Sequence, residues 1–300
     1  MSIPNAMTVD VEDYYMVSAF ERVVARDRWH EYESRVAANT DRLLAIFAES
    51  GVRATFFVLG WVAEKDGSIV RRIAEAGHEV ASHGFGHRLV YDQSPEEFRD
   101  DVRRARRVLQ DLSGQAVGGY RAPSFSVTRR SLWALDVLAG EGHTYDTSIF
   151  PIRHDRYGIP DAPRHPYRVG VSAGQRDTGS GVGQPFRVAE GGLLEIPAST
   201  IRVFGQNLPI AGGGYFRLLP YAWARFGIRR LNESEGKAAV FYMHPWEIDP
   251  QQPRLEASTL SRFRHYRNLE KTEGRLRRLL TDFRFGPITD VILPAAPEAA

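Results

Sequence analysis

Short apolar runs alternate with amphipathic stretches along the first half of the chain. The apolar runs are bounded by polar residues and glycines, which predicts short buried strands over Ala6–Val11, Ala54–Leu59, Glu79–Ser82 and Gly118–Arg121. Two stretches between them, Asn39–Ser50 and Pro95–Leu112, repeat apolar residues at helical spacing, and Ser94 precedes the second as an N-terminal cap. This alternation predicts an α/β fold with a parallel sheet, closed or open, and functional residues at the carboxyl ends of the strands.

The second half predicts a loop, two more strands and a long helix. Arg164–Pro185 is rich in Gly, Ser and Arg without periodicity, so we expect an exposed loop or an irregular hairpin there. Leu193–Ile196 and Ala238–Met243 are apolar enough to be buried strands. A basic amphipathic helix is expected over residues 257–281, docked through Leu260, Phe263, Leu269, Leu276 and Leu279. We expect one domain over residues 1–293 and a disordered tail over 294–300.

The composition excludes several classes of function. Lys and Arg number 39 against 37 for Asp and Glu, a formal net charge of +2, so no nucleic-acid partner is expected. Because the chain has no cysteine, any metal must be bound by His, Asp or Glu. No apolar run approaches the roughly 20 residues of a membrane span, and the first residues lack the pattern of a secretory signal. We therefore expect a soluble, cytoplasmic protein without a membrane span.

His83 and His87 follow a predicted strand at a spacing that suits metal binding. Two imidazoles four positions apart on a turn can point at one ion. Taken alone, the pair is equally compatible with two polar histidines on a surface loop. The interpretation as a metal site therefore depends on a second set of ligands.

Three carboxylates, Asp10, Glu12 and Asp13, follow the first predicted strand, where an α/β barrel holds its active site. In isolation they are compatible with a solvated acidic turn, but a nearby cation would relieve their repulsion. Combined with histidine nitrogens, these oxygens suit zinc, with cobalt, nickel, iron or manganese as alternatives. Strand alternation places Asp10 and Glu12 on one face and Asp13 on the other.

Two further polar residues lie at the ends of predicted strands. Arg121 can hold a carboxylate bidentately and keep it ionised, as a general base requires, although a surface arginine near a turn is the simpler interpretation. His244 ends the strand of Ala238–Met243 and is placed to donate a proton. By itself it could equally be a packed or capping histidine.

Together these motifs resemble those of the polysaccharide deacetylases of carbohydrate esterase family four. That family has an acidic motif after its first strand, a two-histidine metal motif, an Arg-x-Pro motif, an Asp-bearing motif and a late His motif. Candidates for all five occur here, in this order, over Met7–Asp249. The sequences VDVEDYY, YRAPSFS, YDTSIFP and MHPWE resemble the branch associated with bacterial exopolysaccharide gene clusters. The resemblance implies a distorted (β/α) barrel of about seven strands.

The resemblance implies that His83, His87 and one carboxylate bind a divalent metal ion, with zinc as the first expectation. The common acidic motif of the family has adjacent aspartates, whereas this chain reads Asp-Val-Glu-Asp, so Glu12 and Asp13 compete for the metal. Strand alternation favours Glu12. Gly84 stands where the family usually has Ser or Thr, which removes a hydroxyl but no ligand.

The resemblance also implies the acid–base roles. Asp10, oriented by Arg121, resembles the general base that takes a proton from the attacking water. His244 resembles the general acid that protonates the leaving sugar amine, and we expect it on the opposite side of the site from Asp10. Asp146 resembles the carboxylate that supports this histidine.

The implied activity is metal-dependent removal of N-acetyl groups from an amino-sugar polysaccharide or its oligosaccharide precursor. Four side chains near the motifs are candidates for substrate binding, although core packing also accounts for aromatic residues: Tyr120, Pro123, Tyr215 and Trp246. Gly212–Arg217 predicts a flexible turn that shapes a sugar subsite or only reverses the chain. Two alternatives stay open: a hydrolase of a small cyclic amide or ureide on the same fold, and a catalytically silent carbohydrate-binding protein. The oligomeric state is also open.

Overall fold

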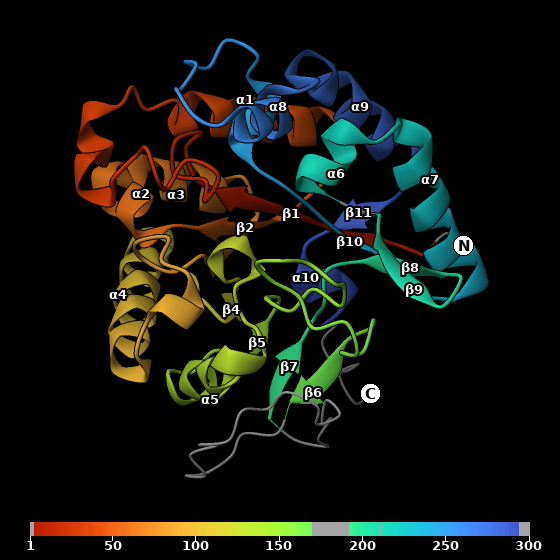
Figure 1. Ribbon diagram of the computed structural model, residues 1–300, viewed down its shortest axis with the longest axis horizontal. Helices are drawn as coiled ribbons and strands as arrows, with labels where there is room; N and C mark the ends of the chain where they lie inside the picture. The colour runs from red at the N-terminus through yellow and green to blue at the C-terminus, as the bar shows by residue number, and fades with distance from the viewer. Residues whose placement is uncertain (1–2, 170–191, 211, 294–300) are drawn as a thin grey trace. The chain divides into compact units, whose positions relative to one another are not determined.

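A computed structural model of the chain describes residues 3–169, 192–210 and 212–293 (Figure 1). Its main sheet has the strand order β10-β1-β2-β3-β4-β5-β7-β6, with β11 added beside β1. The strands of this sheet are β1 (Asn5–Val11), β2 (Thr55–Val58), β3 (Glu79–Ser82), β4 (Gly119–Tyr120), β5 (Tyr145–Asp146), β6 (Tyr167–Val169), β7 (Leu193–Glu195), β10 (Val240–Met243) and β11 (Phe285–Gly286). The nine strands exceed the seven or so that were expected.

The strand pairs β1–β10, β1–β11, β3–β4, β4–β5 and β5–β7 are parallel, whereas β6 runs antiparallel to β7. All seven residues of β1 are buried, as in a strand covered on both faces. A separate antiparallel pair consists of β8 (Thr200–Val203) and β9 (Gln206–Pro209). The six strands predicted from apolar runs are all present, and their bounds shift by no more than two residues at either end.

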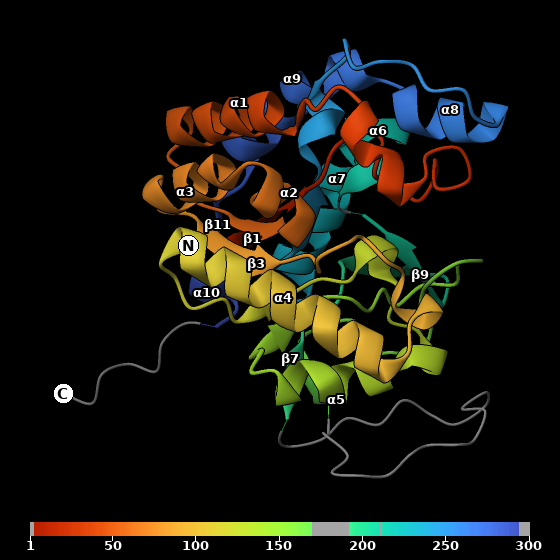
Figure 2. The ribbon, with the colours of Figure 1, turned by 90° about the vertical axis from the view of Figure 1, so that its left-hand side faces the viewer.

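The chain folds as two compact units, and the boundary between them falls inside β2, inside α3 (Gly67–Glu75) and inside β3. The first unit holds residues 1–56, 71–79 and 210–300. Its other helices are α1 (Val36–Glu49), α6 (Gly213–Leu218), α7 (Tyr221–Arg229), α8 (Thr259–Tyr266), α9 (Leu269–Asp282) and α10 (Ile288–Val291). Helices α1 and α9 lie side by side (Figures 1 and 2), joined by the ion pairs Arg42–Glu273 and Glu49–Arg277.

The second unit holds residues 57–70 and 80–209, with the helices α2 (Gly60–Lys65), α4 (Pro95–Ser113) and α5 (Trp133–Gly140). Helix α4 lies along α2 and α5 (Figure 2). As predicted, α4 begins after Ser94, whose hydroxyl accepts the N–H of Glu97 while the Glu97 carboxylate accepts the N–H of Ser94. Its apolar face, which includes Phe98 and Val102, belongs to one buried cluster with Leu135 and Leu138 of α5.

Short turns of 3₁₀ or π helix complete the described elements: η1 (Arg26–Glu31), η2 (Val90–Asp92), η3 (Pro123–Phe125), η4 (Arg129–Ser131), η5 (Arg230–Ser234) and η6 (Pro245–Ile248). Within the described residues, no helix is both long and apolar enough to cross a membrane.

Two predictions about the second half were wrong. The single helix expected over residues 257–281 is two helices, because Asn268 adopts a left-handed φ of 58° between α8 and α9. Leu269, Leu276 and Leu279 dock as expected, but Leu260 and Phe263 on α8 are exposed by 57% and 52%.

The glycine-rich stretch expected to be a turn forms α6 from Gly213 onward. Most of the loop predicted over Arg164–Pro185, and the tail predicted over 294–300, lie outside the described residues.

Candidate functional site

The acidic segment at the end of β1 is buried, and its three carboxylates have different surroundings. Asp10, Glu12 and Asp13 are each at most 2% exposed, so the solvated acidic turn is excluded. One carboxylate oxygen of Asp13 accepts bonds from the Ser34 hydroxyl at 2.8 Å and from the backbone N–H of Arg35 at 2.9 Å. Asp13 therefore holds the chain at the start of α1. This corrects Asp13 as a metal candidate, because its oxygens are already occupied by donors.

The histidine loop after β3 presents one imidazole in a defined tautomer. Nδ1 of His83 lies 2.8 Å from the backbone carbonyl of Arg121. A carbonyl only accepts, so Nδ1 carries the hydrogen and Nε2 keeps the lone pair that a metal requires. His87 adopts a left-handed φ of 51°, and its ring centroid lies 5.5 Å from that of His83. The geometric condition for a shared ion, two neighbouring rings, is met.

Asp101 of α4 holds this loop and was not predicted. Its carboxylate accepts the backbone N–H groups of Phe85 at 2.7 Å and Gly86 at 3.2 Å. Gly84 has a φ of 75°, and a Cβ added there would lie 2.9 Å from Asp101 Oδ2. The glycine that departs from the family pattern is therefore required by the path of the loop. No sequence signal linked Asp101 to this loop. Asp101 lies 15 residues after Gly86, on a helix whose charged residues were expected to face the solvent.

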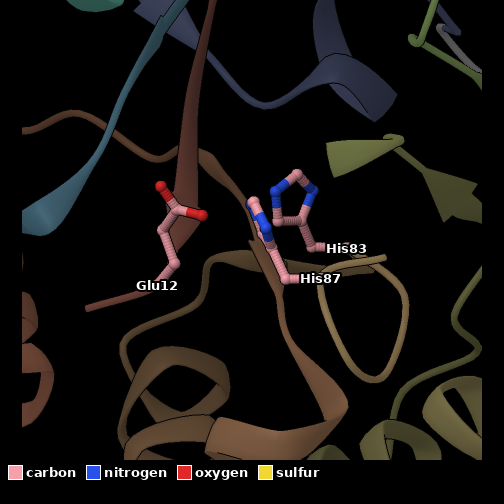
Figure 3. A group of neighbouring side chains, drawn as sticks. All are labelled: Glu12, His83 and His87. Carbon is pink, nitrogen blue, oxygen red and sulfur yellow. The ribbon is translucent and has the colours of Figure 1, made fainter. Parts of the chain in front are cut away.

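Three side chains in the described residues form a group able to hold a metal ion: Glu12, His83 and His87. One ligand atom from each lies within 4.8 Å of the others, and all three residues are buried. In Figure 3 the Glu12 carboxylate and the two imidazoles point toward a common space. One carboxylate and two imidazoles are a donor set typical of zinc sites that keep open positions for water or substrate. The residues therefore fit a divalent metal ion.

The Arg121 loop is buried and backbone-strained. The Arg121 side chain is 1% exposed, its guanidinium lies over the Phe57 ring at 4.3 Å, and one of its N–H groups is 3.4 Å from the Thr147 hydroxyl. Ser124 and Phe125 both adopt left-handed φ values, 54° and 52°. Such strain in consecutive residues persists only where the surrounding structure enforces it, as it does at functional sites. A surface arginine near a turn is excluded.

His244 lies among three carboxylates of its own unit. Its Nδ1 is 2.5 Å from Glu247 Oε1, and its Nε2 lies 3.6 Å from Glu12 Oε1 and 3.9 Å from Asp10 Oδ2. Burial alone would lower the pKa of His244, but the hydrogen bond to Glu247 and the negative charges of Glu12, Glu247 and Asp10 raise it to about 9. The imidazole is thus held as a cation at neutral pH, which is the form that donates a proton.

Two expectations about this histidine were wrong. The carboxylate on its Nδ1 is Glu247, whereas Asp146 accepts the Ser148 hydroxyl on a different strand end. His244 also lies beside Asp10 rather than opposite it. The register of β1 and β10 explains this, because Val9 is paired with Met243 and the next residues of the two strands are Asp10 and His244.

Glu247 is a second residue that the sequence interpretation missed. It is fully buried, and its other carboxylate oxygen is 3.2 Å from Nε of Arg217, itself 3% exposed. Arg217 also donates to the backbone carbonyls of Arg264 and His265 at 3.0 and 2.7 Å. A signal was present: Glu247 is three residues after His244 on a turn begun by Pro245, the spacing that brings two side chains together.

The predicted substrate-binding residues are mostly part of the core. Tyr120 is 1% exposed, with its ring against Phe98. Pro123 is also buried. Trp246 is 4% exposed and stacks on the imidazoles of His244 and His265, so it supports the acid instead of offering a face to a sugar. Tyr215, which is partly exposed on α6, stays a prediction.

Two family models match this chain, and one of the matches includes the two histidines. Residues 27–139 match the family model described as "Polysaccharide deacetylase", and residues 147–293 match "Domain of unknown function (DUF3473)". Residues 27–139 are thus similar to the polysaccharide deacetylases. His83, His87 and Arg121 lie within this match, whereas Asp10 and Glu12 precede it.

Two curated bacterial deacetylases align with about a third of the chain. A peptidoglycan-N-acetylglucosamine deacetylase of Bacillus cereus is 29% identical over 36% of this chain and 44% of its own length. A chitooligosaccharide deacetylase of a Bradyrhizobium strain is 34% identical over 33% of this chain and 43% of its own length. The chain thus spans less than half the length of these relatives.

A solved structure extends the likeness to the whole fold. The crystal structure of a Mycobacterium smegmatis protein, by name a candidate polysaccharide deacetylase, has a TM-score of 0.61 and 21% sequence identity. The match covers 97% of this chain and 88% of the other. The α/β fold of the distorted (β/α)-barrel type expected from the sequence is therefore confirmed.

Proposed function

We propose that the protein is a metal-dependent hydrolase that removes N-acetyl groups from an amino-sugar polysaccharide or its oligosaccharide precursor, in exopolysaccharide biosynthesis. The observation that carries the proposal is the grouping of Glu12, His83 and His87 within 4.8 Å. The match of residues 27–139 and the deacetylase names of the relatives support this substrate class.

Glu12, His83 and His87 would hold the divalent ion, which would supply a polarised water and a Lewis acid for the amide carbonyl. The chain's own residues supply the proton transfers. Asp10, a buried carboxylate whose Oδ2 lies 3.9 Å from His244 Nε2, accepts the proton of the water that attacks the acetamide carbon. Asp10 is the proposed base because Asp13, the other candidate nearby, is fully engaged by donors at the start of α1.

His244 then donates its Nε2 proton to the sugar nitrogen as the carbon–nitrogen bond breaks, so that the amine leaves neutral. The acetyl group departs with the oxygen of the attacking water. The two residues end the cycle as protonated Asp10 and neutral His244. Because Asp10 Oδ2 and His244 Nε2 are 3.9 Å apart, the proton has a short path back from the base to the acid.

The test couples metal analysis of the purified protein to acetate release from a panel of acetylated glycans. The panel contains chitooligosaccharides, peptidoglycan fragments and acetylated exopolysaccharide, with a cyclic ureide as the small-amide comparison. We expect about one divalent ion per chain and acetate from at least one glycan. Hydrolysis of the ureide alone would replace the proposal with a small-amide hydrolase, and glycan binding without acetate release would make the protein a silent binder.

A further inference from the structure

Asp146 and Glu195 are two carboxyl groups that the acid–base scheme above does not use. They lie on adjacent parallel strands, β5 and β7, in paired register. Both are fully buried. In the described part of the chain neither forms an ion pair with Lys or Arg. Two neighbouring buried carboxylates would repel each other strongly, so this arrangement requires an explanation.

The hydrogen bonds of the four carboxyl oxygens explain how the two groups can lie so close together. Asp146 Oδ1 accepts the Ser148 hydroxyl at 2.5 Å, and Glu195 Oε1 accepts the backbone N–H of Ile149 at 2.9 Å. Asp146 Oδ2 and Glu195 Oε2 have no donor among the described residues, although the two side chains are within hydrogen-bonding reach of each other. A single proton between these two oxygens satisfies both atoms and removes one of the two charges.

The electrostatic surroundings agree with this geometry. Burial raises the pKa of Glu195 well above its ordinary value, and the charge of Asp146 raises it further. Burial also raises the pKa of Asp146, to about 6, against the lowering effect of its hydrogen bonds. The titratable side chains that act on the pair are the buried phenols of Tyr120 on β4 and Tyr167 on β6, which are neutral at pH 7. Arg121 is the charged group held by the same loop, through Thr147.

We propose that Glu195 is a positioning residue that stays protonated and donates its acid proton to Asp146, fixing the loop that carries Arg121. The connection is direct. The Ser148 hydroxyl, which donates to Asp146, accepts the backbone N–H of Ala122 at 2.7 Å. The backbone N–H of Thr147, the residue before Ser148, donates to the carbonyl of Tyr120 at 3.0 Å. The residues on both sides of Arg121, Tyr120 and Ala122, are thus hydrogen-bonded to the segment that the carboxyl pair anchors. The expected effect on turnover rests on the proposed function.

The test compares Glu195→Gln with Glu195→Ala in the full-length chain. A Gln carbonyl can accept the Ile149 N–H while its NH₂ donates to Asp146, so it mimics the protonated acid. Ala leaves Asp146 Oδ2 buried without a donor. Glu64→Gln is the matched control, because Glu64 pairs with Arg104 at the surface of the same unit and is 40% exposed.

Three measurements decide the proposal. At pH 7 the infrared band of a protonated carboxyl should disappear in Glu195→Gln and persist in Glu64→Gln. In Glu195→Gln the unfolding equilibrium constant should lie within about twofold of the wild-type value or below it. In Glu195→Ala it should rise roughly tenfold or more. Acetate release should fall about tenfold in Glu195→Ala through kcat, and Glu195→Gln should restore it.

The pH dependence gives a further readout. An acid whose pKa is raised by folding stabilises the fold fully below its ordinary pKa, about 4.3 for Glu, and loses this contribution as pH rises toward the raised value. Wild type should therefore lose stability relative to Glu195→Gln as pH rises above about 4. If Glu195→Gln is as damaged as Glu195→Ala, or if the acid band persists in it, Glu195 acts as an ionised group and the proposal is overturned. A wild type that releases no acetate would refute the proposed function while the infrared and stability results still decide the carboxyl pair.

Discussion

Replacing Glu247 with Gln perturbs the proposed acid without touching any candidate metal ligand. Glu247 is fully buried between the imidazole of His244 and the guanidinium of Arg217. The amide keeps the size of the side chain, and its oxygen can still accept one hydrogen bond. Its NH₂ group, however, must point at either His244 or Arg217, and both of these groups donate hydrogen bonds. The change therefore removes the negative charge that holds the imidazole as a cation.

The magnitude follows from two contributions. A pKa raised from 6.5 to about 9 corresponds to roughly 3 kcal/mol of preference for imidazolium, of which Glu247 supplies one part and Glu12 and Asp10 the rest. In addition, Arg217 is 3% exposed and would lose its only carboxylate partner in the described residues. Breaking a buried pair in this way typically costs about 3–5 kcal/mol of stability.

The sign of the pH effect is fixed by the direction of the shift. The raised pKa of His244 stabilises the fold fully below 6.5, and this stabilisation is lost as pH rises through about 9. Glu247→Gln should reduce it, and the alkaline limb of kcat should move to lower pH by about one unit.

The assay is kcat for acetate release between pH 5 and 10, with urea unfolding and metal content measured on the same preparations. Glu49→Gln is the control, because Glu49 pairs with Arg277 at the surface and is 59% exposed. We expect a loss in kcat of about tenfold at pH 8 with metal content unchanged. An unchanged alkaline limb in a folded, metal-loaded variant would show that Glu247 does not set the protonation of the acid and would refute the reasoning.

Three further substitutions test the rest of the site. His87→Ala should reduce bound divalent metal to well below half an equivalent by elemental analysis, whereas retention of a full equivalent would remove His87 from the ligand set. Asp10→Asn should lower kcat by about 100-fold or more with metal content intact, and loss of metal would instead make Asp10 a ligand. Gly84→Ala should destabilise the protein by roughly 1–3 kcal/mol in urea unfolding, because φ is 75° and the new Cβ meets Asp101 at 2.9 Å; unchanged stability and metal affinity would mean that the loop adapts.

The sequence predicted those strands and helices that are determined by residues close together along the chain. β1 and β3 were found from their apolar runs, and α4 from its cap at Ser94, because burial and capping act within a few residues. The break at Asn268 was not predicted, since the apolar spacing of Leu269–Leu279 continues that of α8 closely enough to hide a single left-handed residue.

The site residues divide in the same way. Glu12 and His83 were predicted because each directly follows a strand, and His87 because it lies four residues after His83 and offers a complementary ligand. Glu247 was missed because the resemblance had already assigned a carboxylate to His244, so the spacing of three residues was not used. Glu195 lies 49 residues from Asp146, and only the register of β5 and β7 brings the two together. No motif within either segment carries that information.

The position of the acid next to the base has a consequence for how the site is controlled. Asp10 and His244 are neighbours because β1 and β10 are paired in parallel and the two residues directly follow the last pair, Val9 and Met243. Their protonation is set separately. Glu247 and Arg217, which lie on η6 and α6, hold the imidazole from the side away from Asp10, through Nδ1. A variant can therefore shift the pKa of the acid without moving it, and a loss of activity in Glu247→Gln at unchanged Asp10–His244 distance would be electrostatic in origin.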